Sequence, residues 1–132
     1  METEADWEVF EGVQQPFRSV DEPRVTLGPR GTFYMNGMAF EAIGSPPTVE
    51  LMYDRGRRVI GMRAVDPRVR NAFKIVRHGK VGTYKRICAS SFCNHMRITR
   101  TGTVVFNQVA VDDNGVMTLD LGATSVVKRG SR

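Results

Sequence analysis

The sequence predicts a small α+β protein that is mostly β, built from two tandem β-β-α-β-β pseudo-repeats at residues 24–64 and 74–122. Two observations predict this class. Short β-branched runs alternate with glycine-containing turns, and the same order of predicted elements occurs twice. A unit of about 45 residues is marginal alone, so we expect the two units to pair about a pseudo-twofold and share one core.

The first unit opens with two short strands and a helix. The segment from Arg24 to Asn36 reads RVTLGPR and then GTFYMN, which is a β-branched run, a glycine-containing turn and a second strand. A helix follows, because Asn36 is a typical N-cap and Gly44 is typical of a helix C-terminus. Its apolar stripe at helical spacing consists of Met38, Ala39, Ala42 and Ile43.

A hairpin closes the first unit. Two strands, Thr48–Tyr53 and Val59–Ala64, flank the turn Asp54-Arg55-Gly56-Arg57. The first strand alternates, and we expect Val49 to face inward and Met52 to join it where the turn distorts the register.

The second unit repeats this order. Residues 74–87 read KIVRHGK, one inserted valine and GTYKRI, which aligns Lys80 with Arg30 and Tyr84 with Phe33. Two strands around a turn are therefore expected again.

A second helix and a second hairpin complete the repeat. The helix spans residues 89–96, with Ser90 as its cap and Phe92 and Met96 on one face. The hairpin joins Val104–Val111 to Val116–Leu121 through Asp112-Asp113-Asn114-Gly115, in which Asn-Gly is a strong hairpin signal.

Three segments lie outside the two units. Residues 1–23 form an acidic, aromatic N-terminal arm, which either docks its aromatics on the core edge or folds back over a basic surface. Residues 65–73 link the units, and residues 123–132 form a basic tail, of which we expect residues 129–132 to fray. The single domain is thus predicted to span residues 24–122.

The charge is distributed unevenly along the chain. Residues 1–54 carry three Arg and ten acids, whereas residues 55–100 carry thirteen Lys/Arg and one acid, Asp66. A face made from the second stretch would have no internal partner for its positive potential and would attract a polyanion. This basic band predicts a nucleic-acid surface whose members are Arg55, Arg57, Arg58, Lys85, Arg86, Arg97 and Arg100.

The first unit, VTLGPRGTFYMNGMAFEAIGSPPTVELMYDRGRRVIGMRA, resembles the swapped-hairpin DNA-binding domain of AbrB/SpoVT-type regulators and of the MraZ family, which carries the unit twice. The resemblance implies a small interleaved barrel or two packed hairpin layers with short helices. It also implies contacts with double-stranded DNA from Arg30 and Lys80, and a role as a transcription regulator or nucleoid-type protein. Two units in one chain suit a monomer, and a small homo-oligomer is the alternative.

The first functional hypothesis is duplex DNA binding, in which turn Arg and Lys side chains clamp phosphates. An alternative is single-stranded nucleic-acid binding, for which exposed sheet aromatics would stack on bases. The candidates are Phe33, Tyr34, Phe73 and Tyr84, of which Tyr34 and Tyr84 are expected to be exposed. A third hypothesis is an adaptor whose basic face docks an acidic protein.

No catalytic constellation is visible, so we expect no enzyme and no cofactor. The spacing of Cys88, Cys93 and His95, with His78 upstream, lacks the paired ligands of a structural zinc site, so no metal is expected. The acidic N-terminus does not read as a secretory signal, and no apolar run is long enough to span a membrane. Two sparse thiols suit a reducing cytosol, so the predicted location is cytoplasmic.

Overall fold

The computed structural model describes residues 22–79, 84–99 and 101–127. Within these residues the strands form two antiparallel sheets, one of six strands in the order β11-β8-β1-β2-β7-β6 and one of five in the order β5-β3-β4-β10-β9. The six-stranded sheet consists of β1 (Val25–Leu27), β2 (Thr32–Met35), β6 (Val76–Arg77), β7 (Lys85–Cys88), β8 (Val104–Phe106) and β11 (Thr124–Val126). The five-stranded sheet consists of β3 (Thr48–Asp54), β4 (Val59–Ala64), β5 (Phe73–Lys74), β9 (Val109–Val111) and β10 (Met117–Asp120). Two short helices, α2 (Gly37–Ala42) and α3 (Ser90–Met96), complete the described fold.

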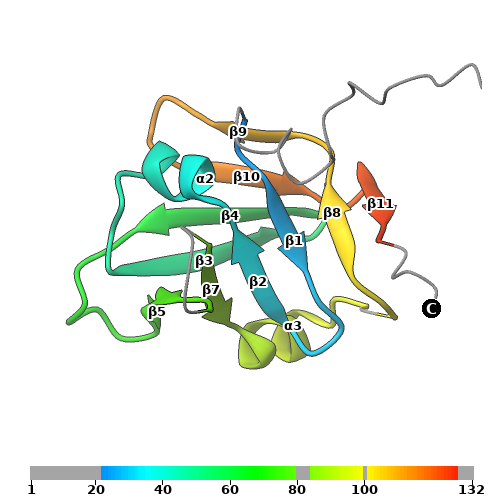
Figure 1. The fold of residues 1–132 in the computed structure, drawn as a ribbon. Coiled ribbons are helices and arrows are strands. Elements are labelled where there is room, and N and C mark those ends of the chain that lie inside the picture. The colour runs from blue at the N-terminus through cyan, green and yellow to red at the C-terminus, as the bar shows by residue number, and fades with distance from the viewer. Residues whose placement is uncertain (1–21, 80–83, 100, 128–132) are drawn as a thin grey trace, which may run out of the picture.

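The predicted α+β, mostly β class is confirmed, and of the two predicted packings the layered one is observed. Figure 1 shows β1, β2 and β8 lying across β3, β4 and β10 of the other sheet. The core between the layers includes Phe33 and Ile87 from one sheet and Ile60 and Leu119 from the other. The predicted barrel is wrong, because the described strands of the two sheets share no hydrogen-bonded pair and each sheet keeps two edges.

The first unit follows its predicted order closely. Asn36 caps α2, and its Oδ1 accepts a hydrogen bond from the Ala39 backbone N–H at 2.9 Å. At the other end, Gly44 adopts a φ of +92°, and its N–H and that of Ser45 bond to carbonyls of the last turn. The predicted stripe is half wrong: Ala39 and Ile43 are buried, whereas Met38 and Ala42 are exposed, because a six-residue helix turns a narrow face inward.

The first hairpin forms as predicted, with β3 and β4 paired from Val49↔Ala64 to Asp54↔Val59. Val49 is fully buried, whereas Met52 is only half-buried and lies in the row that faces away from the core. The turn residues therefore project from the end of a regular hairpin.

The second unit departs from its prediction at two strands. The run at 73–77 divides between the sheets, since β5 pairs with β3 whereas β6 pairs with β7. The predicted strand Val104–Val111 also divides, into β8 and β9 on different sheets. Inward-facing positions change from even to odd numbers across Asn107 and Gln108, so this segment is a corner between the layers.

Two further details of the second unit are corrected. Ser90 lies inside α3, and Ala89 takes the N-cap position without a side-chain hydrogen bond. The alignment of Tyr84 with Phe33 is not a structural equivalence, because Phe33 is fully buried whereas Tyr84 is 37% exposed. In β7 the side that faces the core belongs to Lys85 and Ile87, so the aromatic of the aligned motif lies on the opposite face.

The pairing of strands from the two predicted units runs through the middle of both sheets. Strand β2 pairs with β7, and β4 pairs with β10, each antiparallel. These two pairings join strands that hold matching places in the two predicted units, and the duplication itself stays a prediction.

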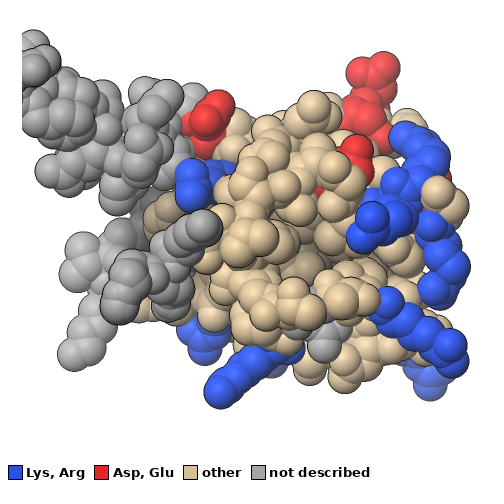
Figure 2. All heavy atoms as spheres, turned by 90° about the vertical axis from the view of Figure 1, so that its right-hand side faces the viewer, with Lys and Arg blue, Asp and Glu red and all other residues tan. Residues whose placement is uncertain are grey.

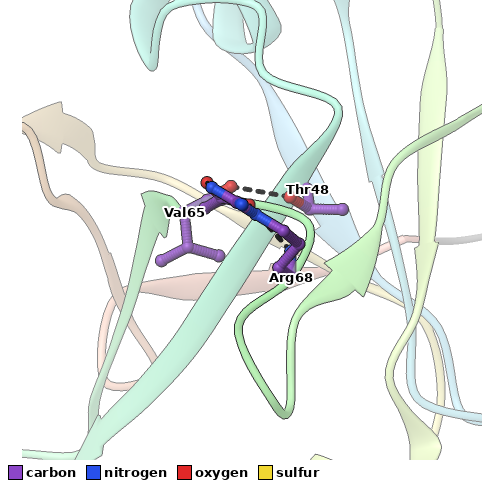
Figure 3. Close-up of polar contacts among 4 residues, drawn as sticks. Thr48, Val65 and Arg68 are labelled. Atoms are coloured by element: carbon purple, nitrogen blue, oxygen red, sulfur yellow. Dashed lines mark hydrogen bonds and ion pairs between the residues drawn. The ribbon is translucent and has the colours of Figure 1, made fainter.

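The linker and the tail are joined to the sheets. Thr48 at the start of β3 donates its hydroxyl to the Val65 carbonyl at 2.7 Å, which fixes the chain just after β4 (Figure 3). Nearby, side-chain and backbone hydrogen bonds from Arg68 lower the pKa of the Asp66 carboxyl. Residues 124–126 form β11 beside β8, so the sheet extends beyond residue 122, where the domain was predicted to end. The arm at 1–21 and residues 128–132 lie outside the described residues.

Candidate nucleic-acid interface

The outer face of the six-stranded sheet carries a continuous row of side chains. Strand alternation turns Val25, Leu27, Phe33 and Met35 into the core and leaves their neighbours outside. The register then places six outward residues directly opposite one another across all six strands. From edge to edge they are Val76, Arg86, Tyr34, Thr26, Val105 and Ser125.

A groove of about 810 Å³ runs over this face, and we call it the sheet groove. It is lined by Arg24, Thr26, Gly28, Pro29, Arg30, Thr32, Tyr34, His78, Tyr84, Thr103 and Val127. The lining thus combines two guanidinium groups, three aromatic rings and three threonine hydroxyls. None of these described lining residues carries a carboxylate, so the positive charge of the groove has no partner in its own wall.

Asn36 holds Arg24 at the rim of the sheet groove. The Asn36 side-chain oxygen accepts from the Arg24 backbone N–H at 3.0 Å, and the Asn36 backbone N–H donates to the Arg24 carbonyl at 3.0 Å. The same side chain donates from Nδ2 to the Glu22 carbonyl at 2.8 Å. Because Asn36 is buried, the backbone that carries Arg24 is fixed against the sheet.

Arg30 reaches the sheet groove from the turn between β1 and β2. The following residue, Gly31, has a φ of +88°, and a Cβ there would lie 2.7 Å from the Ser90 Cα. The Gly31 carbonyl also accepts from the Ala89 N–H at 2.9 Å. The turn that presents Arg30 is therefore seated directly on the start of α3.

Two of the three aromatic rings of the sheet groove are in contact. The rings of Tyr34 and His78 meet edge to face with their centroids 4.8 Å apart. The backbone of His78 is tied to that of Tyr84 by a hydrogen bond of 2.9 Å. Tyr84, which is 37% exposed, presents the more open surface of the two tyrosines.

The predicted turn arginines lie elsewhere, at the end of the first hairpin. Arg55 donates from Nη1 to the Met96 carbonyl at 3.0 Å, and its guanidinium carbon lies 5.7 Å from the centre of the Tyr53 ring. This contact joins the hairpin end to the C-terminus of α3, which Arg97 terminates with a φ of +59°. This contact brings the hairpin turn that carries Arg55, Arg57 and Arg58 to the end of α3 that precedes Arg97, and we call these four residues the turn cluster.

Two members of the turn cluster already have partners. The Arg55 guanidinium satisfies a carbonyl at the end of α3, where a positive charge is also favoured by the helix dipole. Arg57 lies 3.5 Å from the Asp54 carboxylate, with its own side chain 77% exposed. The cluster is thus less purely basic than the sequence suggested.

The remaining predicted site residues are dispersed. Arg86 lies on the outer row of the sheet and donates to the Arg77 carbonyl at 3.1 Å. Lys85 points to the other side of β7, where its Nζ lies 5.0 Å from the centre of the Phe40 ring. Lys80 and Arg100 lie outside the described residues.

The basic band at 55–100 therefore does not gather into one surface. Its described members divide between the turn cluster, the outer row of the six-stranded sheet and the edge beside α2. On the face shown in Figure 2, Lys and Arg side chains lie along one side, along the lower margin and at the upper left, and residues other than Lys, Arg, Asp and Glu fill most of the middle. Neighbours in the sequence were separated because alternate strand residues point to opposite faces.

Sequence reasoning missed most of the lining of the sheet groove, including Arg24, His78 and Thr103. Arg24 was placed in the acidic half of the chain, His78 was considered only as a zinc ligand, and Thr103 was not considered. Arg24 could have been found from period-two alternation, since Arg24, Thr26 and Gly28 share the face opposite Val25 and Leu27. His78 and Thr103 join the groove only through pairings between distant strands.

Among the described residues no group of three or more His, Cys, Asp or Glu side chains is arranged to hold a metal ion. Both cysteines are free; Cys88 is exposed and Cys93 is buried. In the part of the chain that the structure describes, neither helix has the length and apolar composition needed to cross a bilayer. Comparisons with protein-family models, curated proteins and solved structures found no match.

Proposed function

We propose that this protein binds single-stranded nucleic acid in the sheet groove. The observation that carries the proposal is the composition of the groove wall, in which Tyr34, Tyr84 and His78 lie among Arg24 and Arg30 with no carboxylate in the described lining. Aromatic rings on a sheet stack with unpaired bases, and neighbouring cations neutralise the phosphates.

The shape of the site favours a single strand over a duplex. The groove is a hollow on one sheet face, and its rings can be reached only by bases that are free to turn toward the protein. In a duplex the bases are stacked inside the helix, and its phosphates would contact only the rim cations. We expect Tyr84 to be the first stacking platform, because its ring is exposed whereas that of Tyr34 is half-buried beneath the contact with His78.

Duplex DNA binding through the turn cluster is the second candidate function. Its support is the 3.0 Å contact between Arg55 and the Met96 carbonyl, which gathers arginines from a hairpin end and a helix end. Projecting turn arginines can contact phosphates without reading bases. The role in transcription regulation or nucleoid organisation that the AbrB/SpoVT and MraZ resemblance implies belongs to this candidate.

The experiment is fluorescence anisotropy with a labelled single-stranded oligonucleotide and its duplex, each across a salt series. We expect the single strand to bind more tightly, with an affinity that falls steeply as salt rises because counterions are released. Tyr84→Leu should weaken single-strand binding several-fold, since stacking contributes about 1–3 kcal/mol per base. Leucine keeps most of the apolar volume, so the change tests the ring.

A charge-reversed turn cluster is the control that separates the candidates. Arg57→Glu with Arg58→Glu should leave single-strand binding nearly unchanged if the sheet groove is the site. Tighter duplex binding that this variant abolishes would favour the second candidate instead. Binding of an acidic protein, with no binding of either nucleic acid at low salt, would favour the adaptor hypothesis.

A monomer acting in the cytoplasm, without enzymatic activity or cofactor, completes the proposal. The two free thiols suit a reducing compartment. Pairing of β2 with β7 and of β4 with β10 inside one chain supplies the contacts that two separate copies would otherwise make.

A further inference from the structure

Gly28 lines the sheet groove and, having no side chain, leaves an open position in the groove wall. A Cβ at this position would lie 3.8 Å from Tyr34 Cε2 and 3.9 Å from Thr103 Oγ1. A ring edge and a hydroxyl therefore flank one backbone position that carries no side chain. This open position has an apolar side and a polar side, so a small ring that carries one hydroxyl could bind there.

The hydroxyls of the groove are available for a ligand. Thr26, Thr32 and Thr103 make no side-chain hydrogen bond to any residue that the structure describes. Threonines elsewhere differ, because the hydroxyls of Thr48, Thr118 and Thr124 each donate to a backbone carbonyl. A hydroxyl can donate one hydrogen bond and accept others, so it matches another hydroxyl on a ligand.

We infer that the sheet groove prefers RNA to DNA, with a ribose over Gly28 and its 2′-hydroxyl bonded to Thr103 Oγ1. This inference rests on the proposed function and names its substrate class. The ring edge of Tyr34 supplies the apolar contact for the sugar, and Arg24 lies on the same strand face to meet a phosphate. A deoxyribose would place an apolar carbon against the Thr103 hydroxyl, and the 2′-hydroxyl is the group by which proteins distinguish RNA from DNA.

The test compares three labelled single strands of one sequence, made as RNA, as deoxyuridine-containing DNA and as 2′-O-methyl RNA. Anisotropy titrations of the full chain should give an affinity about fivefold higher for RNA than for DNA, the size expected for one net hydrogen bond. The 2′-O-methyl strand, which has lost its donor and gained bulk, should bind no better than DNA.

Two variants locate the discrimination. Thr103→Val removes only the hydroxyl and should lower RNA affinity to that of DNA while DNA affinity stays constant. Gly28→Ala should also lower RNA affinity by at least about fivefold, because the added methyl group would occupy the position that we propose for the ribose. Its contacts of 3.8–3.9 Å are ordinary ones, so the free energy of unfolding should not fall. The matched control is Thr118→Val, whose hydroxyl donates to Ala110 on the other sheet.

The outcomes separate this inference from the proposed function. Equal affinity of the wild-type chain for RNA and DNA would overturn the inference and leave the single-strand proposal standing. An equal loss for both strands in Thr103→Val would also overturn it, because the hydroxyl would then have a general role. Failure of every single strand to bind would overturn both proposals together.

Discussion

The outer faces of the two sheets are built from the same alternation of strand residues, and they differ in whether their charged side chains have partners of opposite charge. On the five-stranded sheet, Glu50 and Arg63 lie opposite each other and form an ion pair of 2.6 Å. On the six-stranded sheet, Arg24 and Arg30 border a groove without any carboxylate in its described lining. Charge that is neutralised within the protein offers little to a partner, whereas unpartnered charge attracts one.

One glycine on each sheet shows that the two outer faces also differ in the free volume above them. A Cβ at Gly61 would lie 3.1 Å from both Met52 Cε and Val116 Cγ1, so side chains already cover that part of the five-stranded sheet. At Gly28 the nearest atoms would be at 3.8 Å, which leaves room above the six-stranded sheet. This difference is the reason that we place the proposed binding site on the six-stranded sheet, where neighbouring side chains leave both volume and charge unfilled.

The largest expected effect comes from breaking the turn that presents Arg30. Gly31→Ala forces a side chain onto a φ of +88° and brings its Cβ to 2.7 Å from the Ser90 backbone. We expect a loss of about 3 kcal/mol or more in the free energy of unfolding, measured by urea denaturation.

The control for Gly31→Ala is Gly44→Ala, at a glycine with a similar φ of +92° where an added Cβ would have no atom within 4 Å. It should cost only about 1 kcal/mol, which is the strain of the backbone conformation alone. Equal losses in the two variants would contradict the proposed seating of the turn on α3.

Neutralising the groove should remove the difference in charge between the two faces. Arg24→Gln with Arg30→Gln should lower single-strand affinity about tenfold or more at low salt, because two phosphate contacts are lost. Arg63→Gln with Arg68→Gln lowers the net charge equally, and both of these arginines pair with acids in the native fold. Anisotropy titrations that show equal losses for the two double variants would mean that only net charge matters.

Adding one methyl group to each face should sharpen the difference in packing. Gly61→Ala should destabilise the fold by about 1 kcal/mol, because Val116 is stiff at χ1 and has little freedom to move away. Gly28→Ala should be neutral or slightly stabilising in the same urea experiment. Destabilisation of equal size at both sites would show that the six-stranded sheet is not open above Gly28.

The smallest expected effect lies in the linker, which belongs to neither face. Because hydrogen bonds from Arg68 lower the Asp66 pKa below 3.8, the pair stabilises the fold above that pH and loses its contribution as the pH falls through the lowered value. The Arg68 side chain is 90% exposed and the Asp66 side chain 46% exposed, so solvent screens the pair and the effect should be small. Urea midpoints for Asp66→Asn and wild type should differ slightly at neutral pH and converge at a pH below the lowered pKa; a constant gap would contradict the assignment.

Local signals in the sequence predicted the local parts of the fold. The Asn36 cap, the hairpin of β3 and β4 and the Asn-Gly turn before β10 each depend on residues close together in the chain. The division of residues 104–111 was missed, although the inward positions change from Val104 and Phe106 to Val109 and Val111. That change of parity marks a strand that leaves one sheet for the other, and it is readable in principle.

The candidate site was less predictable than the fold. Charge was counted along the chain, and this count selected Arg55 and Lys85, whose contacts with Met96 and Phe40 became visible only in three dimensions. The groove takes Arg24 from the entry to β1, His78 from beyond β6 and Thr103 from the approach to β8. Their meeting depends on the strand order, which no local pattern encodes. Of the two tyrosines that were expected to be exposed, Tyr84 is exposed and Tyr34 is half-buried, and both line the sheet groove.

Amide chemical-shift mapping with a single-stranded oligonucleotide tests the central claim most directly, since it compares the two faces in one experiment. We predict that the largest shifts fall on residues 24–28, 32–34 and 84–86, with His78 among them, while Glu50, Arg63 and Thr118 stay unchanged. Shifts concentrated on residues 54–58 and Arg97, without shifts in the sheet groove, would contradict the account and assign binding to the turn cluster.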